Sequence, residues 1–228
     1  MLEGITGGEK VREAEEMIKR GGLDEKKLRA RLGADWKLIA EVARARIKAK
    51  NKFSRNDLWM DLEGGLRYAT HEIVARYRAE RMKEFGGVKS VADVSCGVGI
   101  QLIFYAMKVE RAYGIDIDPL KIEFARRNAN LYGVHNIEFI NADSLSPETV
   151  GKIDAEVIFS DPARPPEMPE RRLEDLLPSP PLAVYNAYRP PKTDAFIFDL
   201  PPQMRRERVP WRGGSSSTST SSGGPSTG

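Results

Sequence analysis

Short apolar runs alternate with amphipathic segments through the second half of the chain, and this pattern predicts strands separated by helices. The expected strands cover residues 88–95, 112–117, 137–141, 155–160 and 195–200. Helices are expected at about 100–108 and 119–132, the second with Asp118 as its N-cap and Pro119 in its first position. Such alternation favours an α/β fold in which a parallel sheet is covered on both faces.

The first half reads as helical. Apolar side chains recur at helical spacing and predict two or three helices over residues 9–50, and Thr70 is expected to cap a further helix that runs to about Phe85. Prolines are dense over residues 161–202, which limits helix there to short pieces. We therefore expect a helical region at 1–50, a main domain at 51–212 and a flexible Gly/Ser/Thr tail at 213–228.

The composition limits which kinds of site and which cellular location we expect. The chain of 228 residues has one Cys and two His, which excludes an internal disulfide and argues against a metal site. The longest apolar runs are far below the roughly 20 residues of a membrane helix, and the acidic start lacks the apolar block of a secretory signal. We expect a cytoplasmic protein without a membrane segment.

Positive charge gathers in the first part of the chain. Residues 1–90 carry a net charge of +6 and the remainder −3, which gives the overall +3. The segment 37–55 holds seven basic residues and Glu41 as its one acid. Such a cluster suits contacts with nucleic-acid phosphates, although a solvated helix face in a Lys/Arg-rich protein would look the same.

A strand that runs into a glycine turn, Asp93-Val94-Ser95-Cys96-Gly97-Val98-Gly99, is the first chemical motif. Glycines let the backbone bend sharply and approach a ligand. A dinucleotide fingerprint needs another small residue three positions on, where this chain has Leu102. The carboxylate of Asp93 at a ligand-facing strand end would repel pyrophosphate and attract a cation. The turn therefore favours S-adenosylmethionine over NAD, but an ordinary tight turn remains the alternative.

Two more acids follow at successive strand ends. Asp116 comes 17 positions after Gly99, where an acid can accept both ribose hydroxyls, and Asp143 could accept an adenine amino group. The backbone of Ala142 or Ser144 could contact the ring edge, and Ile117 and Cys96 complete the candidate cofactor site. Each acid alone could be a loop residue, and Cys96 could be a packing residue. Three acids in one row at the sheet edge indicate that they bind one ligand.

With these residues in hand, the chain resembles the class I S-adenosylmethionine-dependent methyltransferases, and more closely the trimethylguanosine-synthase-like enzymes and prokaryotic methyltransferases with a THUMP-like domain. The resemblance is carried, in order, by KFSRNDLWMDLEGGLRYATHE, DVSCGVG, GIDIDPLKIEFARRNANLYGV, IEFINAD and DPARP. It implies a Rossmann-like sheet and methylation of RNA, often at a guanine amino group. It also implies that Thr70 lies in a segment that folds over the cofactor.

The fourth strand end departs from the family pattern. Ser160-Asp161-Pro162-Ala163-Arg164 replaces an acid or serine, two prolines and an aromatic residue. Asp161 is the candidate to hold the target N–H group, Pro162 would stiffen the turn and Arg164 could bind phosphate or a base edge. Asp161 also fits a turn residue before proline, and Arg164 a surface residue. The cap-stacking tryptophan of the family has no counterpart, so tRNA or rRNA is the expected RNA rather than a capped one.

The sequence also predicts how the sheet ends. A full class I sheet adds two strands after the fifth, but residues 203–212 are too short for two strands, so we expect them to be absent. Strand 195–200 would then be an uncovered edge prone to self-association. Three functions stay open: an RNA methyltransferase, a non-catalytic fragment that binds cofactor or RNA, and a methyltransferase for another substrate.

Overall fold

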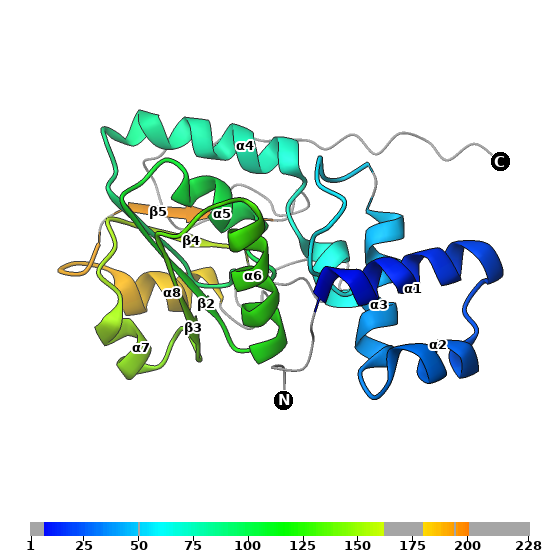
Figure 1. Cartoon of the computed structure of the whole chain (residues 1–228). Helices are drawn as coiled ribbons and strands as arrows, with labels where there is room; N and C mark the ends of the chain where they lie inside the picture. The colour runs from blue at the N-terminus through cyan, green and yellow to red at the C-terminus, as the bar shows by residue number, and fades with distance from the viewer. Residues whose placement is uncertain (1–6, 50, 162–179, 194, 201–228) are drawn as a thin grey trace, which may run out of the picture.

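The structure is a computed structural model that describes residues 7–49, 51–161, 180–193 and 195–200. Its centre is a five-stranded sheet in the order β3-β2-β1-β4-β5, with all four neighbouring pairs parallel (Figure 1). The strands are β1 (Ser90–Asp93), β2 (Arg111–Asp116), β3 (Ile137–Asn141), β4 (Val157–Ser160) and β5 (Ala195–Phe198). The order reverses beside β1, and this arrangement confirms the predicted Rossmann-like α/β fold.

Helices cover both faces of the sheet (Figure 1). On one face, α5 packs on β1 and β2, α6 packs on β2 and β3, and α4 lies against α5. On the other face, α8 packs on β4 and α7 contacts α8. The bounds are α4 (Glu72–Arg81), α5 (Ile100–Ala106), α6 (Pro119–Leu131), α7 (Pro147–Lys152) and α8 (Pro181–Tyr188), with a 3₁₀ turn η2 (Met82–Phe85) after α4.

Strand side chains alternate between two cores. Val91 and Val157 belong to the core under α4–α6, whereas Ala92 and Ile158 belong to the smaller core under α7 and α8. Both faces are apolar because both are covered, as expected for a parallel sheet. The same alternation determines which side chains at the strand ends point toward the face of the sheet that α4–α6 cover.

Three N-terminal helices, α1 (Gly7–Gly21), α2 (Glu25–Leu32) and α3 (Trp36–Lys48), pack together beside α6 (Figure 1). A short π-helix, η1 (Leu62–Leu66), contacts α3. The buried residues of α1–α3 and those under α4–α6 form one continuous apolar cluster. The helical N-terminal half agrees with the pattern of its apolar positions.

Two helix boundaries differ from the expectation. The N-cap of α4 is His71, whose ring nitrogen accepts the Ile73 N–H at 3.3 Å, so the prediction that Thr70 caps this helix was wrong by one residue. The α-helix also ends at Arg81, before η2. By contrast, Asp118 caps α6 as predicted, accepting the Leu120 N–H at 2.9 Å, with Pro119 in the first position.

Candidate functional site

Every strand of the sheet has an aspartate at or just after its carboxyl end. Register pairs Asp93 with Gly114 and Phe159, Asp116 with Asn141, and Ser160 with Phe198. The acids therefore follow one another along a single edge. In spatial order they are Asp143, Asp116, Asp93, Asp161 and Asp199. Ligands of open α/β sheets bind at this carboxyl edge, beside the point where strand order reverses.

A cavity of about 410 Å³ lies over this edge, within the usual size of a ligand pocket. It gathers nine of the ten positions that the sequence proposed for a cofactor, the exception being Gly99. Asp161, proposed for catalysis, also lines it. The nine are Thr70, Asp93, Cys96, Gly97, Asp116, Ile117, Ala142, Asp143 and Ser144.

Asp93 is the most deeply buried acid of the site, with 2% of its surface exposed. Its Oδ1 accepts the Ser95 N–H at 3.0 Å. Burial, and secondarily the negative charges of Asp161 and Asp116, raise the pKa of this carboxyl well above its usual range. Among the described residues no cation forms an ion pair with it. A ligand that brings a positive charge would relieve this penalty.

Asp116 supports the glycine turn. Its Oδ2 accepts the Gly97 N–H and its Oδ1 accepts the Asp118 N–H, both at 2.9 Å. A carboxylate has about four lone-pair positions, so each oxygen can still accept a hydroxyl. Ile117 follows with 62% of its surface exposed, which places an apolar side chain on the cavity wall.

The end of β3 is tied to the end of β2. The Asn141 side chain donates to the carbonyls of Asp116 at 3.0 Å and Ile117 at 2.9 Å. Asp143 is exposed and its Oδ1 accepts the Leu145 N–H at 2.9 Å. Behind it the Tyr188 hydroxyl donates to the Ser144 carbonyl at 2.6 Å. Asn141 is a positioning residue that the sequence reasoning missed.

The two turn glycines serve different purposes. Both have positive φ, +54° at Gly97 and +82° at Gly99. A Cβ at Gly97 would meet open space, whereas one at Gly99 would lie 2.9 Å from the Ala125 Cβ in α6. Gly97 thus leaves room at the cavity, and Gly99 lets the start of α5 approach α6. Gly99 acts through helix packing and does not line the cavity.

Cys96, beside these glycines, is buried, and burial raises the pKa of its thiol well above the usual range. It lines the cavity as a small, uncharged wall.

A segment before α4 forms the opposite wall. Its lining residues are Gly64, Gly65, Arg67, Tyr68, Ala69 and Thr70. The two ends of the segment are held together, because the Glu72 carboxylate accepts the Ser54 N–H at 2.6 Å and the Ser54 hydroxyl at 2.8 Å. Within it, Asp61 caps η1 by accepting the Gly64 N–H at 2.7 Å. The resemblance implied that the segment around Thr70 covers the cofactor, but the sequence named none of its other lining residues, since the segment has no periodicity.

The end of β4 contributes Phe159 and Asp161 to the cavity lining. The Asp161 N–H donates to the Ser95 hydroxyl at 2.8 Å, which links the end of β4 to the glycine turn. Asp199 forms an ion pair with Arg78 at 2.8 Å, and Arg78 also donates to Gln101, which lines the cavity, at 3.4 Å. Pro162 and Arg164, the other two catalytic candidates, lie outside the described residues.

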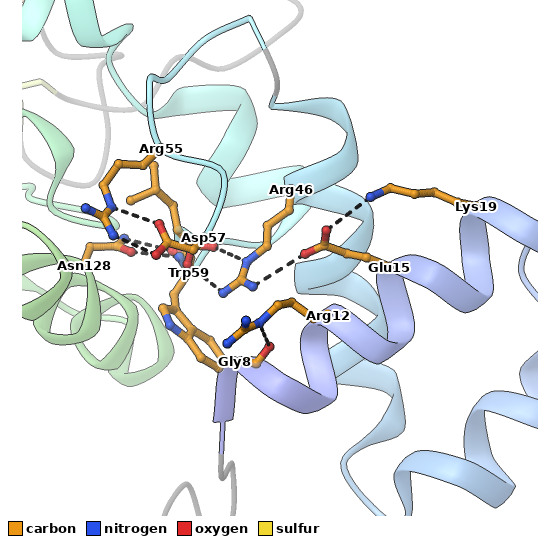
Figure 2. A network of polar contacts seen from close by, with 10 residues as sticks. Gly8, Arg12, Glu15, Lys19, Arg46, Arg55, Asp57, Trp59 and Asn128 are labelled. Carbon is orange, nitrogen blue, oxygen red and sulfur yellow. Dashed lines mark hydrogen bonds and ion pairs between the residues drawn. The ribbon is translucent and has the colours of Figure 1, made fainter.

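Several basic side chains of segment 37–55, the cluster that the sequence proposed for phosphate contacts, make contacts within the fold. Arg46 is buried and donates to the carbonyls of Leu58 at 2.8 Å and Asp57 at 2.7 Å (Figure 2). Arg55 forms an ion pair with Asp57 at 2.7 Å. Lys52 donates to the Leu66 carbonyl, and burial lowers the pKa of its ammonium group. The charged groups of Arg46, Arg55 and Lys52 therefore bind backbone and carboxylate groups of the fold.

Trp59 is likewise part of the framework. It is buried, and its ring lies 5.2 Å from the Arg46 guanidinium and 4.5 Å from the Arg127 guanidinium. Its backbone N–H donates to the Asn128 side chain at 2.8 Å (Figure 2). It is an anchor between α3 and α6.

Within the described ranges no group of three or more His, Cys, Asp and Glu side chains is arranged to hold a metal ion. The helices described in the structure include none with the length and hydropathy needed to cross a bilayer.

Comparison with known proteins now adds to this geometry. Residues 88–177 match the family model described as RNA cap guanine-N2 methyltransferase. The whole fold is similar to a solved structure of a proposed methyltransferase from Porphyromonas gingivalis, with a TM-score of 0.64 and 16% identity over 86% of this chain and 50% of that one. The fold is that of class I methyltransferases.

Two curated relatives carry names that bear on chemistry. One is an uncharacterized S-adenosylmethionine-dependent methyltransferase of Mycobacterium tuberculosis, 34% identical over 143 residues, which are 60% of this chain and 37% of the relative. The other is an uncharacterized RNA methyltransferase of Oceanobacillus iheyensis, 38% identical over 77 residues, which are 32% of this chain and 17% of the relative. The chain thus spans little more than a third of the length of the Mycobacterium tuberculosis relative.

Proposed function

We propose that this chain is an S-adenosylmethionine-dependent methyltransferase that acts on RNA. The observation that carries the proposal is the convergence of Asp93, Asp116 and Asp143 with the glycine turn on one cavity. A buried acid without a described ionic partner suits the ammonium group, and the more exposed acids suit hydroxyl and amino donors. The names of the relatives agree with this ligand.

Each part of the cofactor has a candidate partner. Asp93 would bind the ammonium group, Asp116 the two ribose hydroxyls and Asp143 the adenine amino group. The backbone of the Cys96–Gly97 turn would lie against the amino-acid part, where Gly97 leaves open space. The remaining candidates would enclose the ligand: Thr70 from the covering segment, and Ile117, Ala142 and Ser144 beside the base.

The cofactor supplies a methyl group activated by a positively charged sulfur. The residues of the chain have to align a nucleophile with that methyl and remove a proton. We propose that Asp161, at the fourth strand end, accepts the N–H of the target amine and takes its proton as the new N–C bond forms. Its position is supported by the bond from its backbone N–H to Ser95. Pro162 and Arg164 remain candidates on sequence grounds for shaping this turn and binding RNA.

RNA is the proposed substrate class because the matched family and the Oceanobacillus relative are named for RNA methylation. A guanine exocyclic amine is the finer proposal, from the family description. The DPAR sequence at strand four supports the prokaryotic THUMP-like relatives over the cap enzymes. We also propose that residues 1–50 are a helical support for a domain at 51–212. The proposed tail, 213–228, lies outside the described residues.

The test combines binding with transfer. S-adenosylhomocysteine should bind in calorimetry, and radiolabelled methyl should pass from S-adenosylmethionine to total RNA. Asp161→Ala should lose at least about a hundredfold in transfer, in line with general-base contributions, while its affinity for S-adenosylhomocysteine is retained. Asp154→Ala is the matched control, since Asp154 is exposed before β4 at the opposite edge.

The outcomes separate the alternatives. Binding without transfer to any acceptor would indicate a non-catalytic module, and transfer to a protein or small molecule alone would exclude RNA. Mass spectrometry of digested RNA would then identify the methylated nucleotide.

A further inference from the structure

An exposed aromatic ring lies at the cavity. Of the residues that the structure describes, Phe159 and Tyr68 are the aromatic ones that line it; Phe159 is buried at 1% exposure, whereas Tyr68 is 46% exposed. Tyr68 lies on the covering segment, in sequence directly before Ala69 and Thr70, which also line the cavity. An aromatic ring held at a pocket with half of its surface in solvent is a surface on which a planar group can stack.

Arg67 supplies a cation beside that ring. Its guanidinium lies 5.3 Å from the centroid of the Tyr68 ring. Arg67 is exposed and lines the same cavity. It differs from all three arginines of α4: Arg76, Arg78 and Arg81 form ion pairs with Glu72, Asp199 and Glu84, whereas Arg67 has no carboxylate partner among the described residues.

We propose that Arg67 and Tyr68 form the nucleotide docking point at the cavity, with the target base stacked on the Tyr68 ring and its phosphate bound by the Arg67 guanidinium. An aromatic ring and a guanidinium together match the two parts of a single-stranded RNA nucleotide, a π face and an anion. The inference rests on the proposed function and deepens it by locating RNA recognition. In segment 37–55, by contrast, Arg46 and Lys52 donate to backbone carbonyls of the fold.

The test measures RNA and cofactor binding separately. The RNA probe is a fluorescent single-stranded oligonucleotide of uridines with one central guanosine, titrated in the presence of saturating S-adenosylhomocysteine. Tyr68→Ala should raise its Kd about tenfold or more, whereas Tyr68→Phe should stay within about twofold because the ring is kept. Arg67→Gln should lower the slope of log affinity against log salt by about 1.

A matched control and a matched ligand keep the test specific. Tyr77→Ala removes another exposed ring, 51% exposed and 5.9 Å from the Arg81 guanidinium, that does not line the cavity, and it should leave RNA binding unchanged. An oligonucleotide with an abasic site in place of the guanosine should bind the wild type as weakly as the intact probe binds Tyr68→Ala. Melting temperatures of all variants should agree within about 2 °C, since the substituted side chains are exposed.

Three results would overturn the proposal. One is an RNA Kd that Tyr68→Ala leaves within twofold. Another is a loss of S-adenosylhomocysteine affinity in Tyr68→Ala without RNA, which would make the ring a cover for the cofactor. The third is an Arg67→Gln variant that loses S-adenosylhomocysteine but keeps methylthioadenosine, which lacks the carboxylate. Failure of the wild type to bind S-adenosylhomocysteine would instead refute the proposed function.

Discussion

The carboxylate of Asp116 holds the backbone of Gly97, whose N–H it accepts at 2.9 Å across the gap between β2 and the turn after β1. The same carboxylate accepts the Asp118 N–H, so one side chain fixes two loops of the cavity. The acid that the sequence assigned to the ribose is therefore also part of the framework, and its substitution should affect both binding and stability.

We expect Asp116→Ala to weaken S-adenosylhomocysteine binding by more than tenfold and to lower stability by about 1–3 kcal/mol, because two backbone donors lose their acceptor. Calorimetry and urea unfolding measure the two effects. Asp118→Ala is the control: it removes only the cap of α6, costs about 1 kcal/mol and should leave cofactor affinity intact. Equal affinity of the wild type and Asp116→Ala for S-adenosylhomocysteine would show that Asp116 does not bind the ligand.

Asp93→Asn should stabilise the ligand-free protein at neutral pH while weakening the binding of S-adenosylhomocysteine. Burial raises the pKa of this carboxyl, so the folded protein binds a proton that the unfolded chain releases, and stability falls as pH rises from the unfolded pKa through the folded one. The amide does not ionise and can still accept the Ser95 N–H. Thermal unfolding of the wild type and the variant over a range of pH should show that the difference between their melting temperatures increases as pH rises.

Ligand chemistry offers a check on the same residue. Methylthioadenosine lacks the ammonium group, so Asp93→Asn should leave its affinity within about twofold of wild type while the affinity for S-adenosylhomocysteine falls at least about tenfold. If both ligands lost affinity equally, Asp93 would not face the ammonium group.

Gly99→Ala should destabilise the protein by about 2–4 kcal/mol. The residue has φ +82°, and its new Cβ would lie 2.9 Å from the Ala125 Cβ, so backbone strain and overpacking add. Gly133→Ala, at φ +68° with nothing within 4 Å of the added Cβ, isolates the strain alone. The double variant with Ala125→Gly should recover part of the difference, and urea unfolding would show no recovery if the clash were absent.

Arg46→Met should destabilise the protein by about 3–5 kcal/mol, since Glu15 is left with Lys19 as its ionic partner in a poorly solvated site and the Leu58 and Asp57 carbonyls lose a donor (Figure 2). Arg12→Met, which removes an exposed guanidinium bonded to the Gly8 carbonyl, should change stability by no more than about 0.5 kcal/mol. Similar losses in the two variants, measured by urea unfolding, would contradict a central role for Arg46.

Self-association is expected through β5. All four of its residues are only half-buried, whereas all four of β4 are buried, and within the described residues β5 pairs with β4 alone. An open strand edge can pair with another chain. Light scattering should show a mass that rises with protein concentration, and a monomer across the range would rule this out.

Much of the fold could be predicted because its signals are local. The strand runs, the Asp118 cap and the glycine turn are readable from neighbouring residues, and parallel strands then place their carboxyl ends at one edge. Helix α7 also carried a local signal, Ser146 before Pro147, that went unused. The resemblance implied a covering segment at Thr70, but the roles of Arg67 and Tyr68 could not be predicted, because they reach the cavity only in the fold in which Glu72 binds Ser54.

The sequence by itself determined the order of strands and helices and the row of acids, because periodicity and strand polarity depend on residues near in the chain. Only the tertiary structure decided which charges remain available to a ligand. Seven basic residues in segment 37–55 look alike in sequence, yet Arg46 and Lys52 donate to distant carbonyls, whereas Arg67 meets no carboxylate in the described part of the fold. The reason is physical: a charged group takes its role from the partners that folding brings within a few ångströms of it.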